Sequence, residues 1–327
     1  MSELLDVAMA IARLMKADNI LLLCHKNPDG DTLGSAAALF HALKALGKTV
    51  AVICADPMPE RYAYMCMEEY TGQFEVRYTV AIDVAGIQLF GDAVQQYTRN
   101  IDLCIDHHAS NSQYADGVLL DADAAATAEI MYALLCTMGT VITPLIADCL
   151  YTGVATDTGC FIFGNTTAHT HMVACKLMQL GANTRMLNTL LFESKSRSRM
   201  EIERIALASL SYYLEDRCAI ICLTKEQIEA TGVEMNELES ISGMPRKIEG
   251  VQVGVTLRQL PSGSFKVSIR TQDGIDAAAI ARRLGGGGHA GAAGCEILGS
   301  LENARAAVLA EIERELKIVH VKPQSKE

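Results

Sequence analysis

The segment Cys24-His25-Lys26-Asn27-Pro28-Asp29-Gly30-Asp31 constrains the fold most, because it joins a strand-like run to a helix-like run. The apolar residues 20–24 before it are typical of a buried strand, and residues 33–46 after it repeat Ala and Leu at helical spacing. Open α/β sheets build their sites at such strand ends. Two carboxylates and an imidazole in one tight loop repel one another unless cations lie between them, so the segment predicts a metal site. The alternative is an Asx-rich turn that caps the helix.

Alternating strand-like and helix-like runs organise the first 190 residues. The strand-like runs are residues 20–24, 49–54, 78–83, 101–106 and 118–121. The helix-like runs are residues 4–16, 33–46, 124–138, 144–155 and 168–180, the last closed by Gly181 as a C-cap. This alternation predicts an α/β domain with a mostly parallel sheet and helices on both faces.

The character of the chain changes after Leu191, where residues 193–199 are polar and charged without an apolar stripe. Helical spacing resumes over residues 200–214, so we interpret 191–214 as a linker and a connecting helix. The remainder, residues 215–327, predicts a smaller α/β domain, with a cleft between the two domains. Its expected elements are strands 219–223, 251–257 and 265–269 with a hairpin turn at 261–264, helices 276–284 and 304–316, and a frayed tail from Lys322.

Composition narrows the classes of function. The formal net charge of the 327 residues is −11, and Trp is absent, so a protein that grips long nucleic acid through a basic, aromatic surface is disfavoured. A small phosphorylated substrate is still compatible, because metal ions and a few local cations supply the attraction. The eleven scattered cysteines form no Cys-x-x-Cys pair, which favours reduced thiols in the cytoplasm over disulfides. No apolar run approaches membrane-spanning length.

Further acidic and histidine residues follow the later strands of the first domain. Asp83 ends one strand-like run, Asp106-His107-His108 ends another, and Asp157 lies in an expected turn over residues 153–159. Parallel strands would bring these groups to one edge of the sheet. The candidate metal ligands are His25, Asp29, Asp31, Asp83, His107 and Asp157. Mixed carboxylate and imidazole ligands suit Mn²⁺, and six of them suffice for two ions that share one aspartate.

A glycine run in the second domain is the other candidate binding element. Residues 285–288 are four glycines, which let backbone N–H groups approach an anion, and His289 adds a donor. Arg270, at the end of a strand-like run, could clamp a phosphate or carboxylate. The alternative is a flexible turn between a helix and a strand. Arg258 is expected to be a solvated residue on the outer face of its strand.

These motifs together resemble a known family. His25-x-x-x-Asp29-x-Asp31, Asp83, Asp106-His107-His108 and Asp157 match, in order, the four motifs of the DHH-superfamily phosphoesterases. The glycine run with His289 is similar to the signature of the DHHA1 domain that follows in one branch. The resemblance spans roughly residues 19–294, and the size and two-domain layout are most like the NrnA-type subfamily of bifunctional oligoribonucleases and pAp phosphatases.

The resemblance implies roles for the individual residues. One metal ion would be held by His25, Asp29 and Asp83, and a second by Asp31, Asp83, His107 and Asp157, with Asp83 bridging. His108 would contact the phosphate and Asp106 would orient an imidazole ligand. Arg270, Gly286, Gly287, Gly288 and His289 would bind substrate. Two Mn²⁺ ions, with Mg²⁺ or Co²⁺ as substitutes, would activate a water for attack on phosphorus.

The implied substrates are short RNA oligonucleotides and 3′-phosphoadenosine 5′-phosphate (pAp), with neither long nucleic acid nor a membrane as partner. A soluble hydrolase for cyclic di-AMP or its linear product pApA is the alternative within the enzyme class. A nucleotide-binding regulator with an idle metal centre is a third hypothesis, disfavoured because every expected ligand is present. A homodimer is expected by analogy with other small cytosolic enzymes.

Overall fold

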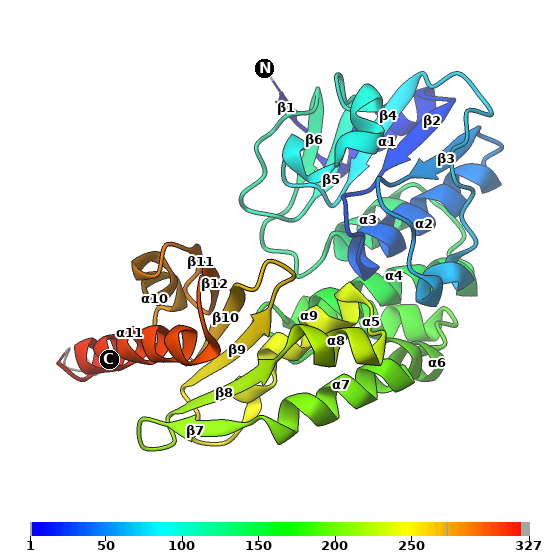
Figure 1. Ribbon diagram of the computed structural model, residues 1–327. Coiled ribbons are helices and arrows are strands. Elements are labelled where there is room, and N and C mark those ends of the chain that lie inside the picture. Colours follow the sequence, from blue (N-terminus) through cyan, green and yellow to red (C-terminus); the bar gives the residue numbers. More distant parts are fainter. Residues whose placement is uncertain (1, 273, 322–327) are drawn as a thin grey trace. The chain divides into compact units, whose positions relative to one another are not determined.

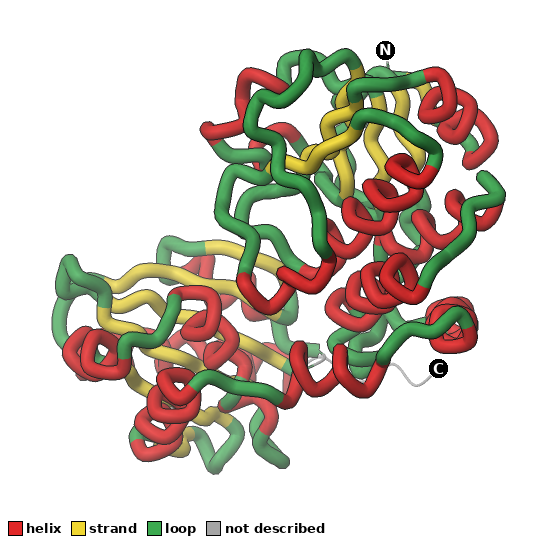
Figure 2. Tube along the Cα trace, turned by 90° about the vertical axis from the view of Figure 1, so that its right-hand side faces the viewer, coloured by secondary structure: helices red, strands yellow, loops and turns green. Residues whose placement is uncertain are grey.

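The computed structural model describes residues 2–272 and 274–321, and the tail predicted to fray from Lys322 lies outside them. The chain divides into two compact units, Met1–Ser194 and Lys195–Glu327, each with its own sheet (Figures 1 and 2). None of the helices in the described part of the chain is long and apolar enough to cross a membrane.

The sheet of the first unit has six strands in the order β1-β6-β5-β4-β2-β3, and every described pairing is parallel. The strands are β1 Glu3–Leu4, β2 Ile20–Leu23, β3 Val50–Ile53, β4 Tyr78–Ile82, β5 Leu103–Asp106 and β6 Gly117–Leu120. The predicted parallel sheet is therefore confirmed. The opening helix was expected from residue 4 but begins at Val7, because the Asp6 side chain caps it through the Met9 N–H and residues 3–4 pair with β6.

Helices cover both faces of this sheet. Long α-helices pack on one face and short 3₁₀ helices on the other. The helices of the unit are α1 Val7–Lys16, α2 Gly30–Ala45, α3 Thr127–Thr137, α4 Pro144–Asp157, α5 Ala168–Gln179 and α6 Thr184–Asn188, followed by the π-helix η4 Thr189–Glu193. One face buries Ile20 and Leu22 of β2 against α1, α2 and α3, together with the 3₁₀ helix η1 Glu60–Met65. The other buries Leu21 and Leu23 under the short 3₁₀ helices η2 Ile87–Leu89 and η3 Asp92–Tyr97.

Helix α4 lies directly against α2 because a glycine opens the space between them. A Cβ on Gly153 of α4 would come within 2.6 Å of Asp31 Oδ1 on α2 and of Ala128 Cβ on α3. Such a contact is far shorter than ordinary van der Waals packing. The glycine therefore lets three helices meet beside the end of the sheet, where Asp31 and Asp157 both lie.

The second unit has a mixed six-stranded sheet in the order β11-β12-β10-β9-β8-β7, in which only β8 and β9 pair in parallel among the described strands. Its strands are β7 Ser211–Tyr213, β8 Cys218–Leu223, β9 Val253–Gln259, β10 Phe265–Thr271, β11 Gly287–His289 and β12 Ala292–Ile297. The predicted hairpin between β9 and β10 is confirmed. The connecting helix was expected to reach residue 214 but ends at Ala208, because residues 211–213 form β7, which pairs with β8 across the turn at 214–216.

Helices cover one face of this sheet fully and the other in part. Helices α10 Ala277–Arg283 and α11 Leu301–Val321 bury one face, as Figure 1 shows. Ile221 and Leu223 of β8 pack on the opposite face against α7 Arg197–Ala208 and α9 Met235–Ser240. The remaining short elements are α8 Lys225–Thr231, η5 Ile241–Gly243 and η6 Pro245–Lys247.

Candidate active site

The six residues predicted as metal ligands meet at one end of the first sheet. Three overlapping clusters of potential ligands form there: His25, Asp29 and Asp83; Asp31, His107 and Asp157; and Asp83, His107 and His108. Asp83 and His107 follow β4 and β5 directly, as predicted, and His25, Asp29 and Asp31 lie between the end of β2 and the first turn of α2. Asp157 is different, because it is the last residue of α4 rather than part of a turn after a strand. Close packing of α4 against α2 carries it to the sheet edge.

Asp83 lies between the two ligand sets. His25 Nε2 is 3.6 Å from Asp29 Oδ1 and 3.8 Å from Asp83 Oδ2. On the other side, His107 Nε2 is 3.6 Å from Asp83 Oδ1 and 3.3 Å from Asp157 Oδ2. The two oxygens of one carboxylate thus face two different imidazoles, which is the arrangement that a shared ligand requires.

The hydrogen bonds of His107 test whether a cation fits this space. His107 Nδ1 lies 3.1 Å from the carbonyl oxygen of Ala124, so Nδ1 carries the proton and donates. Its Nε2 is buried and has no hydrogen-bond partner among the described residues. An unprotonated nitrogen that faces carboxylates leaves its lone pair without a donor, and a metal ion satisfies both groups. The donor set therefore fits a metal ion.

Burial and mutual repulsion also favour a cation. Asp83 is only 3% exposed, and burial followed by the nearby Asp29 charge raises its pKa to about 7. Burial, with the charges of Asp83 and Asp157, raises the pKa of Asp31 well above its usual value. The backbone of Asp83 has φ +61°, a left-handed conformation uncommon outside glycine. A bound divalent ion would reverse these pKa shifts.

Asp31 has a structural partner that sequence reasoning missed. The N-cap residue of α3, Ala126, has no side chain that could cap the helix. Instead, the N–H groups of Thr127 and Ala128 donate to the two oxygens of Asp31 at 2.7 and 2.9 Å, and the Thr127 hydroxyl donates to Asp83 Oδ1 at 2.8 Å. The N-terminus of α3 thus orients both carboxylates. The only signal in the sequence was a helix start without a capping residue.

Asp106 is paired with His108 and not with a predicted ligand. Asp106 Oδ1 lies 2.7 Å from the imidazole Nδ1 of His108 and also accepts the backbone N–H of His107. Its Oδ2 accepts from Asn111 Nδ2 at 2.6 Å. The imidazole that Asp106 orients is therefore that of His108, because the ring of His107 turns to the Ala124 carbonyl instead. The hydrogen bond to Asp106 raises the pKa of His108 to about 9. Asn111 carries no motif and was missed.

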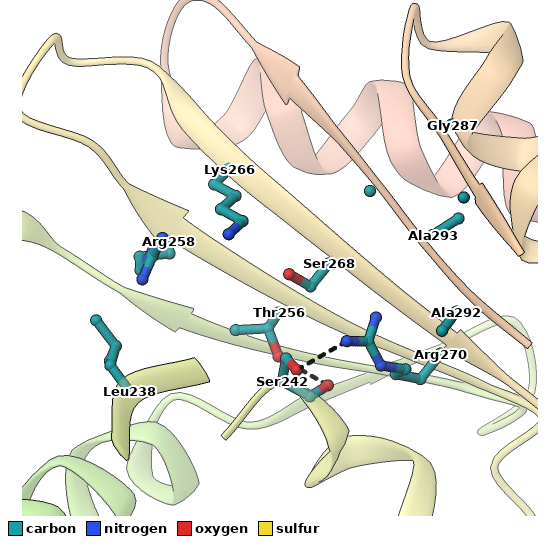
Figure 3. A pocket seen from close by; sticks show the side chains of 12 residues that line it. Leu238, Ser242, Thr256, Arg258, Lys266, Ser268, Arg270, Gly287, Ala292 and Ala293 are labelled. Atoms are coloured by element: carbon teal, nitrogen blue, oxygen red, sulfur yellow. Dashed lines mark hydrogen bonds between the residues drawn. The ribbon is translucent and has the colours of Figure 1, made fainter. Parts of the chain in front are cut away.

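A cavity of about 310 Å³ lies on the partly covered face of the second sheet. Burial alternates along β10, so that Val267 and Ile269 face the core while Lys266, Ser268 and Arg270 face the cavity (Figure 3). Arg270 donates to the Ser242 hydroxyl at 3.2 Å. Arg258, expected to be a solvated residue on the outer face of its strand, is partly exposed and lines the same cavity from β9.

The second half of the glycine run forms a strand, whereas Gly285 lies in the turn that follows α10. Residues 287–289 are β11, which pairs with β12. Gly287 and Gly288 line the cavity, whereas Gly286 and His289 are not among its lining residues and His289 is exposed. Gly288 has φ +144°, and a Cβ there would meet the Ala293 backbone at 2.5 Å. Of the five residues predicted to bind substrate, the structure thus places Arg270, Gly287 and Gly288 at one cavity.

Two family models match the chain. The DHH family, N-terminal domain, matches residues 19–154, and the DHHA1 domain matches residues 219–317. The bifunctional oligoribonuclease and PAP phosphatase NrnA of Thermus thermophilus is 34% identical, over 94% of this chain and 93% of that protein. The NrnA protein of Bacillus subtilis is 26% identical, over 90% of this chain and 94% of its own length.

A solved structure shares the fold. An exopolyphosphatase-related protein from Bacteroides fragilis superposes with a TM-score of 0.85 at 23% identity, covering 96% of this chain and 97% of that one. The match extends over both sheets described above. With the ligand clusters at the end of the first sheet and both domain models matched in order, the chain belongs to the DHH family, with a DHHA1 domain, and is a phosphoester hydrolase.

Proposed function

We propose that this protein is a Mn²⁺-dependent phosphoesterase that degrades short oligoribonucleotides to mononucleotides and removes the 3′-phosphate of pAp. The observation that carries the proposal is the position of Asp83, whose two oxygens face two separate sets of ligands. The names of the two NrnA relatives, bifunctional oligoribonucleases and PAP phosphatases, support this choice of substrates.

The proposed ligand sets follow the clusters. His25, Asp29 and Asp83 would hold one ion, and Asp31, Asp83, His107 and Asp157 the other. A pair of divalent ions neutralises charge on phosphoryl oxygens and makes a nucleophilic water available near neutral pH. The chain contributes the orientation of the ligands: Thr127 holds Asp83, the start of α3 holds Asp31, and Ala124 fixes the ring of His107.

His108 is proposed to bind the phosphate. Its Nδ1 is held by Asp106, and because its pKa is raised to about 9 the ring is protonated at neutral pH. The Nε2–H group is therefore available as a donor to a phosphoryl oxygen. Asp106 acts as a positioning residue, itself held by Asn111.

The cavity of the second unit is proposed to bind a nucleotide of the substrate. Its volume of about 310 Å³ lies at the lower end of the usual range for small-ligand sites. Lys266, Arg258 and Arg270 surround it with positive charge in a protein of net charge −11, which favours a phosphorylated ligand. The backbone of Gly287 and Gly288 offers close approach.

Turnover of a substrate panel tests the proposal. The purified protein with Mn²⁺ is given pAp, RNAs of two to five nucleotides, pApA, cyclic di-AMP and pyrophosphate, and the products are separated by chromatography. Preferential turnover of the short RNAs and pAp supports the proposal. Preference for cyclic di-AMP or pApA supports the alternative, and no turnover of any of them supports the idle regulator. Replacing Mn²⁺ by Mg²⁺ or Co²⁺ tests the metal.

We also propose a cytoplasmic location, because all eleven cysteines are free thiols. The predicted homodimer stays a prediction, which light scattering on the purified protein checks.

A further inference from the structure

Besides the cavity of the second unit, the structure has a cavity of about 560 Å³ in the first unit. The proposed reaction does not use it. It lies between the start of α1, the end of β6, α3 and the first turn of α5, and it is open to solvent at an acidic rim. Its floor is apolar, with Leu5, Leu119 and Ile130 each at most 7% exposed. A cavity of this size is within the range of small-molecule sites.

A buried carboxylate without a partner lines this cavity. Glu129 on α3 is 3% exposed, and its Oε1 has no hydrogen-bond partner among the described residues. Its Oε2 is 4.0 Å from His169 Nε2, which is too long for a hydrogen bond. A buried carboxylate is costly unless a donor or a cation satisfies it. Glu129 therefore points to a ligand with a positively charged donor.

The charges around the cavity select a cation over an anion. Glu129 shares the lining with the exposed carboxylates of Asp6, Asp121 and Asp123, and the lining residues include neither lysine nor arginine. The N-termini of α1 and α5 also reach the cavity, but the side chains of Asp6 and Thr167 cap them. An anionic ligand would thus meet four carboxylates and two capped helix ends.

The ligand donors present favour an organic cation over a metal ion. All clusters of three or more metal-ligating side chains in the described part of the chain belong to the candidate active site, and none includes Glu129 or His169. A zinc-type site holds its ion with at least three such donors together. An alkylammonium ion needs only hydrogen-bond acceptors for its N–H groups and an apolar surface for its carbon chain.

We propose that this cavity, here called the Glu129 cavity, binds a small linear diamine. One ammonium group would donate to Glu129 Oε1, and the alkyl chain would lie on Leu119 and Ile130. The second ammonium group would reach the acidic rim at Asp121 and Asp123. The site is separate from the proposed reaction and does not depend on which phosphoester is the substrate.

Isothermal titration calorimetry of 1,4-diaminobutane into the full chain, saturated with Mn²⁺ to fill the catalytic cluster, tests this proposal. We expect saturable binding with one site per chain. Glu129→Gln, which keeps the side-chain shape, should weaken binding at least tenfold. Butylamine, which lacks the second charge, should bind several-fold more weakly, and 1,4-butanediol should not bind.

Two control variants separate the Glu129 cavity from other acidic surfaces. Glu302→Gln, on an exposed position of α11, and Asp83→Asn, in the catalytic cluster, should both leave the diamine affinity unchanged. Loss of binding in Asp83→Asn with retention in Glu129→Gln would place the diamine in the catalytic cluster and overturn the proposal. Equal binding by all variants would show diffuse attraction of the diamine to an acidic protein. An absence of saturable binding would show that water satisfies Glu129. Either result overturns the proposal.

A second variant covers the case in which Glu129→Gln does not fold. Ala133→Phe adds bulk at an exposed position of the cavity lining without changing a charge. We expect it to weaken diamine binding about tenfold while the melting temperature stays near that of the unmodified protein. Unchanged affinity in folded Ala133→Phe would contradict the proposed position of the alkyl chain.

Discussion

Asp83 combines three features that are each unfavourable in the metal-free protein: burial, neighbouring negative charge and a positive φ. A carboxyl group whose pKa is higher in the folded than in the unfolded chain lowers the stability of the fold. The loss grows as the pH rises from about 4 towards 7, because the unfolded chain releases the proton at the lower pH. A bound cation removes this cost. Asp83 is thus the residue at which metal binding and folding are most strongly linked.

Asp83→Asn should stabilise the metal-free protein and abolish its response to metal. Asparagine tolerates positive φ and can still accept from Thr127, but it carries no charge. We expect the free energy of unfolding at pH 8, in EDTA, to rise by about 1–3 kcal/mol, with a smaller gain at pH 5. Urea denaturation with and without Mn²⁺ measures both effects. A variant less stable than the unmodified protein in EDTA would contradict the repulsion argument.

His108 depends on Asp106 for its orientation and its proton. In Asp106→Asn the hydrogen bond to Nδ1 changes and Asn111 loses its carboxylate acceptor, so we expect kcat to fall about 10²–10⁴-fold. The matched variant Asn111→Ala, which leaves the carboxylate in place, should cost less than tenfold. Steady-state kinetics on pAp compare the two. Equal losses would show that Asp106 acts only through the packing of its loop.

At the scale of elements, the site depends on how closely α2, α3 and α4 approach. No strand or helix carries the whole site: Asp83 follows β4, His107 follows β5, Asp31 is on α2 and Asp157 ends α4. The start of α3 connects these elements, because its free N–H groups bind Asp31. A change that separates the three helices should therefore reduce metal affinity even when it leaves every ligand in place.

Gly153→Ala tests this dependence. The added methyl would lie 2.6 Å from Asp31 Oδ1 and from Ala128 Cβ, so α4 must move. Overpacking of this kind costs about 1–3 kcal/mol of stability, and we expect Mn²⁺ affinity to fall at least tenfold. Gly164→Ala, where a Cβ would meet nothing within 4 Å, is the matched control and should change neither quantity. Calorimetric titration with Mn²⁺ provides the measurement, and unchanged affinity in folded Gly153→Ala would refute the argument.

The outer face of β10 supplies Lys266 and Arg270 to the second-unit cavity, and β9 supplies Arg258. Lys266→Ala should raise KM for pAp about tenfold with a small effect on kcat, because the residue lies among the cavity's cations and outside the metal cluster. Lys317→Ala, on an exposed position of α11, removes the same charge elsewhere and should leave KM unchanged. A fall in kcat without a change in KM would contradict a role in substrate binding.

At the scale of the whole molecule, the two units have separate cores. The buried clusters of the first unit, on the two faces of its parallel sheet, share no residue with those of the second unit. The proposed metal ligands all belong to the first unit, and the cationic cavity belongs to the second. Two ligands should consequently stabilise two different parts of the chain.

Differential scanning calorimetry should resolve this division. Because multidomain chains commonly unfold in more than one step, we expect two overlapping transitions. Mn²⁺ should raise the midpoint of one by several degrees, and adenosine 5′-monophosphate should raise the other. EDTA should reverse the first effect alone. A single transition that both ligands shift equally would show that the units unfold as one.

The sequence by itself determined the parallel sheet of the first unit and the position of His25, Asp83 and His107 at its edge. Both are local properties, because a strand-like run followed at once by Asp or His places that side chain at the strand's end, and parallel strands end at one edge.

Tertiary structure alone decided how the groups are paired. Nothing near Asp31 in the sequence shows that it caps α3, and nothing near Asp106 shows that its imidazole partner is His108 rather than His107. The cavity that Arg258 lines was not foreseen for the same reason, since only the packing around a sheet shows which part of its face is hollowed. The unpartnered oxygen of Glu129 also becomes visible only when α1, β6 and α5 surround it. The contacts of Asp31 and Glu129 join elements far apart in the chain. His108 is only two residues from Asp106, but the choice between His108 and His107 depends on the packing of the His107 ring against Ala124. Local residue patterns do not encode this packing.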